Sequence, residues 1–270
     1  MPIPTHASYQ IHPATESAQA SGAPHLLLAH GALSNSAQWT LNLGPLQGFC
    51  TPVTAELLGH GDSPSPSGTP AYEADAYVDY FETIRQQLGI ERWFLCGYSL
   101  GAGLTMRYAL RYPQQVYGHL FTNSRSAFAD SEQMAKWAAV GQKTIERSES
   151  MGLKYLEKQP FHPRFSTSLP EAVYTPLVAR SKLLNPAGAS KTLAVTAATA
   201  GMRESIKNNT RPALLLQGVR EKGFRPEADF ARKHMPKLES IEIDAGHGVN
   251  MQAAERFNQA VEEFVRTWAT

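Results

Sequence analysis

The sequence predicts an α/β fold with a mostly parallel central sheet, helices on both faces of the sheet, and an inserted helical cap. Short apolar runs alternate along the chain with segments whose apolar residues recur at helical spacing. This alternation is typical of parallel sheets, because each crossover between parallel strands usually contains a helix. The alternation stops between residues 126 and 209, where the sequence is polar and helical. We therefore expect a core of residues 1–125 and 210–270 and a cap of residues 126–209.

The first strands are predicted at 26–29 and 52–57, each followed by a turn that contains glycine. A helix that ends at Gly89 follows them, because apolar residues recur there at helical spacing: Tyr77, Tyr80, Phe81, Ile84 and Leu88. A strand at 93–96 then leads directly into a helix that runs to Tyr112 and stops at Pro113.

Later strands are expected at 116–122, 213–216 and 240–243. Helices are expected at 230–235 and at the C-terminus, where one face is apolar: Phe257, Val261, Phe264, Val265 and Trp268. In the inserted cap, Asp130 followed by Gln133 is a candidate capping box. The aromatic and apolar residues of the cap either line a pocket or form the cap's own core: Trp137, Tyr155, Phe161, Phe165 and Tyr174.

The composition is that of an ordinary globular protein. The chain of 270 residues is 42% hydrophobic and has a formal net charge of +1, so its charge gives no argument for nucleic acid or a membrane surface as a partner. Cys50 and Cys96 lie far apart in apolar stretches, which favours a reducing compartment over a disulfide framework. Residues 1–23 lack the features of a signal peptide, and no apolar run approaches the roughly 20 residues that span a bilayer. We expect a cytoplasmic protein that binds a small-molecule substrate, and the sequence leaves its oligomeric state open.

Residues 97–101 read Gly-Tyr-Ser-Leu-Gly, a G-x-S-x-G motif between a predicted strand and a predicted helix. Such a sharp turn raises the serine hydroxyl to the top of the sheet, so Ser99 is the candidate nucleophile. A serine hydroxyl needs a base that removes its proton. His247 is the candidate base because it follows the last predicted strand between two glycines. The histidines His119, His162 and His234 are expected within a strand, in the cap and on a helix.

The oxyanion that forms on attack needs two preorganised N–H donors. Leu100, after the nucleophile, supplies one, and Ala32, in the loop after the first strand, is the candidate for the other. Trp39 is expected to pack this loop. His30 either braces the loop or takes a direct part in catalysis.

An acid should orient His247, and its expected place is the loop after strand 213–216. Glu221 is the candidate there, with a surface ion pair to Arg220 or Lys222 as the alternative reading. Asp130 is a second candidate acid, whereas Asp244 more simply shapes a strand end. The candidate substrate-binding residues are His30, Tyr98, Arg125, Trp137 and Arg180. No metal-ligand cluster or phosphate-binding loop is visible, so we expect no cofactor and no metal.

Together these residues resemble the α/β-hydrolase superfamily over essentially the whole chain. The resemblance lies in His30-Gly31 with Trp39, the turn at 56–63, the motif at 97–101 and Gly246-His247. The turn usually opens with Asp in the family, but here it opens with Glu56. The resemblance implies an enzyme with a catalytic triad.

Within the superfamily, the chain is most similar to the menaquinone-pathway synthases of 2-succinyl-6-hydroxy-2,4-cyclohexadiene-1-carboxylate. The similarity lies in the loop 218–224 and in a cap pattern of Leu169-Pro170, Arg180 and Leu184-Asn185. This chain departs from those synthases at Gly103, where they carry a carboxylate-binding Arg, at Glu221, which replaces Asp, and at Gly223, which replaces Lys. The departures imply a different and less anionic substrate.

The sequence leaves three functions open. The first is a serine hydrolase that cleaves a carboxylic ester or thioester through an acyl-enzyme. The second is a lyase or synthase that uses the same triad to abstract a proton from a carboxylated substrate. The third is a non-catalytic ligand-binding protein, which the intact Ser99 and His247 oppose.

Overall fold

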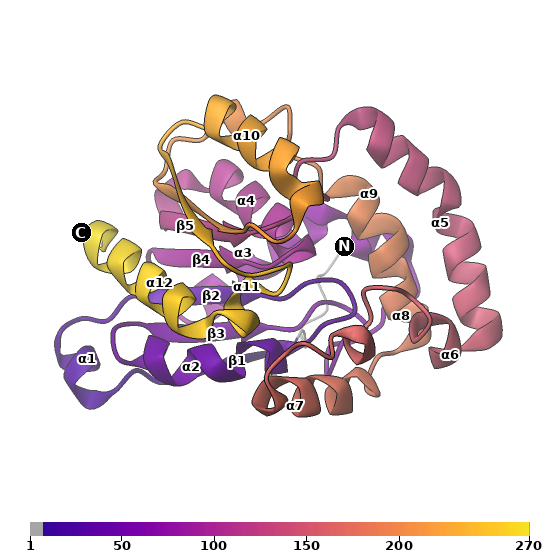
Figure 1. The fold of residues 1–270 in the computed structure, drawn as a ribbon, viewed down its shortest axis with the longest axis horizontal. Coiled ribbons are helices and arrows are strands. Elements are labelled where there is room, and N and C mark those ends of the chain that lie inside the picture. The colour runs from indigo at the N-terminus through magenta and orange to yellow at the C-terminus, as the bar shows by residue number, and fades with distance from the viewer. Residues whose placement is uncertain (1–7, 270) are drawn as a thin grey trace.

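The computed structural model describes residues 8–269, which form a seven-stranded sheet in the order β1-β3-β2-β4-β5-β6-β7 (Figure 1). Only the β1–β3 pair is antiparallel, and the other neighbours are parallel. The predicted fold class is therefore confirmed. The strands are β1 (Tyr9–Ile11), β2 (His25–Ala29), β3 (Thr51–Ala55), β4 (Trp93–Gly97), β5 (Val116–Thr122), β6 (Ala213–Gly218) and β7 (Leu238–Ile243).

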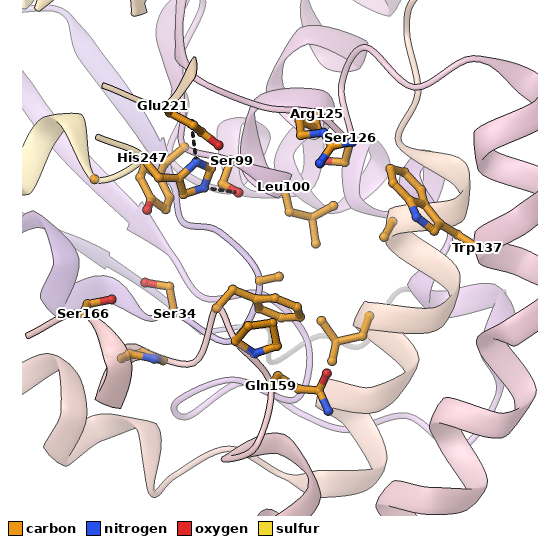
Figure 2. A pocket seen from close by; sticks show the side chains of 18 of the residues that line it. Ser34, Ser99, Leu100, Arg125, Ser126, Trp137, Gln159, Ser166, Glu221 and His247 are labelled. Atoms are coloured by element: carbon orange, nitrogen blue, oxygen red, sulfur yellow. Dashed lines mark hydrogen bonds and ion pairs between the residues drawn. The ribbon is translucent and has the colours of Figure 1, made fainter. Parts of the chain in front are cut away.

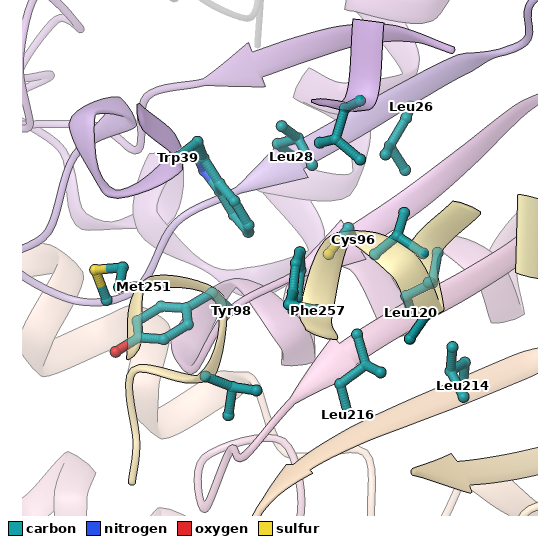
Figure 3. Close-up of a cluster of buried hydrophobic side chains, with 14 of the residues drawn as sticks. Leu26, Leu28, Trp39, Cys96, Tyr98, Leu120, Leu214, Leu216, Met251 and Phe257 are labelled. Atoms are coloured by element: carbon teal, nitrogen blue, oxygen red, sulfur yellow. The ribbon is translucent and has the colours of Figure 1, made fainter. Parts of the chain in front are cut away.

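Helices cover both faces of the sheet, so the inner strands are apolar on both sides. Strand β2 illustrates the alternation of period two. Leu26 and Leu28 pack with the helices α2 (Thr40–Gln47) and α12 (Ala254–Trp268), whereas Leu27 and Ala29 pack with α3 (Ala74–Gln87) and α4 (Leu100–Arg111). Figure 3 shows the first of these two layers, in which Phe257 of α12 lies among leucines of β2, β5 and β6. The helices that cover the core are α1 (Glu16–Ala20), α2 (Thr40–Gln47), α3 (Ala74–Gln87), α4 (Leu100–Arg111), α10 (Arg225–His234), α11 (Val249–Gln252) and α12 (Ala254–Trp268).

The residues between β5 and β6 contain helices as their only regular elements. Figure 1 shows most of them grouped beyond one end of the sheet. We call residues 131–208 the helical segment. Its α-helices are α5 (Ser131–Met151), α6 (Leu153–Leu156), α7 (Glu171–Ser181), α8 (Pro186–Lys191) and α9 (Ala197–Thr199), and a π-helical turn (Thr192–Thr196) joins the last two.

Short 3-10 helices complete the chain: η1 (Ser36–Trp39), η2 (Thr69–Tyr72), η3 (Pro113–Gln115), η4 (Pro163–Phe165), η6 (Ile206–Asn208) and η7 (Lys222–Phe224). Asp130 caps α5 by accepting a hydrogen bond from the backbone N–H of Gln133 at 2.8 Å. This contact is the half of the predicted capping box that involves the aspartate.

Several boundaries differ from the prediction. β3 covers residues 51–55 rather than 52–57, and α10 begins at Arg225 rather than at 230. β1, α1 and α2 were not predicted. No helix in residues 8–269 has the length and apolar character needed to cross a bilayer. The prediction that no signal peptide is present concerns residues 1–23, of which 1–7 lie outside the described part of the chain.

Candidate active site

Ser99 lies between β4 and α4 in a strained turn. Its φ of 52° and ψ of −117° are rarely adopted by a residue other than glycine. The tightness of the turn also explains the two flanking glycines. A Cβ atom at Gly97 would lie 2.4 Å from Cα of Ala102, and one at Gly101 would lie 2.4 Å from the backbone oxygen of Ala29. The G-x-S-x-G sequence is therefore required by the geometry that exposes the serine hydroxyl.

His247 connects Ser99 to Glu221. Its Nε2 lies 2.9 Å from Oγ of Ser99, and its Nδ1 lies 2.9 Å from Oε2 of Glu221 (Figure 2). An ionised carboxylate can only accept, so Nδ1 carries the proton and Nε2 is free to accept the serine proton. The structure thus brings together three side chains from the loops after β4, β6 and β7, as the sequence predicted.

Asn123 is a member of this group that the sequence analysis missed. Its amide Nδ2 donates to Oε2 of Glu221 at 2.8 Å and to the carbonyl of Gly218 at 2.9 Å. Its Oδ1 accepts from the N–H of Gly218, also at 2.9 Å. The side chain is fully buried, so it ties the end of β6 and the carboxylate of Glu221 to the end of β5. The available signal was a polar residue placed directly after a buried strand.

Glu221 is ionised more readily than an ordinary glutamate. Burial alone would raise its pKa, but the hydrogen bond and charge of His247 oppose burial, and smaller contributions come from Asn123 and Arg125. The net effect lowers the pKa. Glu221 is therefore held as a carboxylate facing the histidine, even though its side chain is only 25% exposed.

Two residues that line the cavity beside Ser99 have a backbone N–H without a partner in the described chain. Neither the N–H of Ala32 nor that of Leu100 has a hydrogen-bond acceptor among residues 8–269. Both residues line the same cavity as Ser99. Leu100 is the first residue of α4, where an unpaired N–H is expected.

His60 fixes the loop that carries Ala32. Its Nε2 accepts a hydrogen bond from the N–H of Leu33 at 3.1 Å, and its Nδ1 donates to the carbonyl of Leu58 at 2.9 Å. Complete burial lowers the pKa of His60 to about 3, so the ring stays neutral and remains an acceptor. Trp39 is fully buried after the same loop and packs beside Phe257, with ring centroids 6.2 Å apart.

A cavity of about 850 Å³ opens above Ser99, between the sheet and the helical segment. Its lining is mixed, with hydroxyl and amide groups among apolar side chains. Of the predicted substrate-binding residues, Tyr98, Arg125 and Trp137 line it. Of the aromatic residues predicted for the cap, Tyr155 and Phe161 also line it. Phe165 is half exposed outside it, and Tyr174 packs against the core.

The structure contradicts two predicted substrate contacts. His30 is fully buried beneath the cavity, where Nδ1 donates to the carbonyl of Gly31 and Nε2 lies 3.0 Å from the backbone N of Leu57. Arg180 points to the turn after β3, where its Nη2 lies 3.4 Å from Glu56 and 3.2 Å from Asp62. Neither residue lines the cavity, because the polar groups of each side chain contact the neighbouring loops instead.

The alternative acids lie elsewhere. Asp130 caps α5, and Asp244 is 87% exposed and pairs with Arg220 at 3.2 Å. The three other histidines considered from the sequence also have other partners. His119 contacts Asn209, His162 accepts from the N–H of Arg164, and His234 packs on Phe230.

Gly103 lies one helical turn after the serine, at the position where the synthases that the chain resembles carry an arginine. A Cβ atom there would lie 2.7 Å from the carbonyl oxygen of Ala200. The chain after α9 packs directly on α4 at this point, so a longer side chain has no room. The packing of the helical segment therefore leaves no space for an arginine at this position.

Comparison with known proteins gives one family. A family model described as "alpha/beta hydrolase fold" matches residues 24–254. Carboxylesterase YbfK of Bacillus subtilis is 25% identical over 249 residues, which cover 90% of this chain and 80% of that protein. An uncharacterized protein of Mycobacterium tuberculosis is 36% identical over 97 residues, but this match covers 36% of the chain and 28% of the relative's length.

Among solved structures, MenH from S. aureus superimposes with a TM-score of 0.83. The match covers 98% of this chain and 100% of that one, at 19% sequence identity. At this level of identity the likeness concerns the fold alone.

Proposed function

The chain belongs to the α/β-hydrolase fold family, and we propose that it is a serine hydrolase that cleaves a carboxylic ester or thioester. The observation that carries the proposal is the hydrogen-bonded row of Ser99, His247 and Glu221 at the base of a cavity. A row in this order is what nucleophilic attack by a serine requires. Distant relatives that are carboxylesterases support the same reaction class.

In the proposed reaction, Oγ of Ser99 attacks the carbonyl carbon while Nε2 of His247 takes the hydroxyl proton. The carbonyl oxygen becomes an oxyanion, which the free N–H groups of Ala32 and Leu100 stabilise. Glu221 faces the imidazolium and stabilises its charge without taking the proton. The bond to the leaving oxygen or sulfur then breaks, and His247 gives its proton to the leaving group.

The acyl-enzyme is released by water. His247 accepts a proton from the water as its oxygen attacks the acyl carbon, and the second tetrahedral intermediate uses the same two N–H groups. When the bond to Oγ breaks, His247 returns the proton to Ser99, and the carboxylic acid leaves. In this proposal the helical segment acts as a cap that limits the size of the acyl or leaving group.

The test is hydrolysis of p-nitrophenyl esters from acetate to palmitate, with Ser99→Ala as the matched control. We expect turnover by the wild-type protein and none above background by the folded variant. The preferred chain length then measures the usable part of the cavity. Turnover that survives in Ser99→Ala refutes the proposed nucleophile.

The second candidate is proton abstraction by the same triad, as in a lyase or synthase. The fold likeness to MenH is compatible with it. The packing of Gly103 against Ala200 argues against a substrate with several carboxylates, because it removes the place for an arginine beside the nucleophile. A folded protein that hydrolyses no ester in the panel would favour this alternative.

A further inference from the structure

The cavity above Ser99 contains one cation and one anion among its described lining residues. The anion is Glu221, which is already engaged by His247 and Asn123. The cation is Arg125, in the loop that follows β5. Arg125 is exposed and forms no ion pair or side-chain hydrogen bond with any residue in the range 8–269. Its guanidinium is therefore available to a ligand in the cavity.

Arg180, in contrast to Arg125, has a structural role. Its guanidinium meets the carboxylates of Glu56 and Asp62, which join α7 to the turn after β3. No carboxylate of the described chain takes that place for Arg125. The difference separates the two arginines that the sequence suggested together as substrate contacts.

The surroundings of Arg125 favour a carboxylate as its ligand. In Figure 2, Arg125 and Ser126 lie between Ser99 and Trp137, on the side of the nucleophile away from Ser34 and Ser166. A guanidinium presents paired N–H donors that match the two oxygens of a carboxylate, and the neighbouring Ser126 lines the same cavity. Leu100 and Trp137, which lie near Arg125 and Ser126 in Figure 2, present apolar and aromatic surface to the same cavity. A ligand placed there meets one charged contact and a largely uncharged remainder.

We propose that Arg125 binds a carboxylate of the substrate, so that the enzyme prefers esters with one carboxylate to neutral esters of the same length. This inference rests on the proposed ester hydrolysis and names its substrate class. A cavity with one arginine suits a substrate with fewer carboxylates than a cavity with several arginines would bind.

The test compares two esters of equal chain length, mono-p-nitrophenyl adipate and p-nitrophenyl hexanoate, after subtraction of the uncatalysed rates. The readout is the ratio of their kcat/KM values. We expect the wild-type ratio to be at least tenfold in favour of the adipate ester, and to fall with added salt because the attraction is ionic. Arg125→Gln should lower the ratio at least tenfold.

Lys136→Gln is the matched control, because it also removes one positive charge. Lys136 lies on α5, pairs with Glu132 and does not line the cavity. It should leave the ratio unchanged. A wild-type ratio near one overturns the inference. An equal loss on both esters in Arg125→Gln also overturns it, because the arginine would then act only through Glu221.

Binding separates this inference from the proposed function. Calorimetric titration of adipate into the Ser99→Ala variant measures the affinity for a carboxylate without turnover. At least tenfold weaker binding after the further change Arg125→Gln supports the inference even if no ester is hydrolysed. Equal binding by the two variants contradicts it even if esters are hydrolysed.

Discussion

Replacing Glu221 by Gln tests the role of the acid with the smallest change in shape. The amide keeps an oxygen that can accept from Nδ1 of His247 and Nδ2 of Asn123, which lie 2.9 and 2.8 Å from the native oxygen. The amide nitrogen can take the place of the other carboxylate oxygen. The substitution therefore removes charge while leaving the contacts in place, and the thermal midpoint should stay within about 2–4 °C of the wild-type value, a shift of about 1 kcal/mol.

The expected loss of activity follows from the charge that His247 gains during attack. Two unit charges about 4 Å apart attract by about 4 kcal/mol at an effective dielectric constant of about 20. The side chains of His247 and Glu221 are 42% and 25% exposed, so water screens part of this attraction and about 2–3 kcal/mol remains. We expect kcat on the best p-nitrophenyl ester to fall about 30- to 200-fold, since about 1.4 kcal/mol corresponds to a factor of ten. KM should change little.

Asp244→Asn is the matched control for this prediction. It removes a carboxylate three residues before the histidine, but that carboxylate is exposed and pairs with Arg220. Its kcat should equal that of the wild-type protein. A kcat of Glu221→Gln within threefold of wild type would refute the assignment of Glu221, and an equal loss in Asp244→Asn would show that the effect is only one of net charge.

Three further predictions concern the groups around the site and the core. Asn123→Ala should lower kcat about tenfold and the thermal midpoint by about 4–8 °C, because it leaves the N–H of Gly218 unpaired in the interior and removes one of the two hydrogen bonds to the Gly218 carbonyl, at a cost of about 2 kcal/mol; an unchanged midpoint in calorimetry would contradict this. The wild-type protein should have a larger free energy of unfolding than Glu221→Gln above pH 4.5, the ordinary pKa of glutamate, because the folded state favours the carboxylate. This difference should vanish as the pH falls through the lowered folded-state pKa, and urea unfolding at several pH values would measure it. Burial raises the pKa of Cys50 and raises that of Cys96 to about 12, so both thiols should react with Ellman's reagent only after unfolding in guanidinium; rapid reaction of the native protein would contradict this burial.

The elements that the sequence predicted are those with a strong local signal. β5 was predicted with its observed bounds, because a run of mostly apolar residues lies between Pro113 and the polar loop at 123–126. β1 was missed because it has only three residues, is largely exposed, and depends on pairing with β3 more than 40 positions away. Its signal lies in that pairing, which local periodicity does not contain.

The site shows the same division. Ser99, His247 and Glu221 could be predicted because each follows a strand in a recognisable turn. Asn123 has no motif, and its role depends on the neighbouring strand ends that meet around it. The mistaken placement of Arg180 has a similar cause. Its partner Glu56 lies 124 residues away in sequence, so the ion pair that turns the side chain away from the cavity could not be inferred from local sequence.

The most direct test of the central claim is covalent labelling of the nucleophile. Paraoxon phosphorylates a serine only when the hydroxyl is activated by a base, and mass spectrometry of the intact protein and its peptides locates the label. We predict one diethylphosphoryl group per chain, on Ser99, with none in Ser99→Ala and much slower labelling in His247→Ala. A label on another residue, or ester hydrolysis by a protein that remains unlabelled at Ser99, would contradict the assignment.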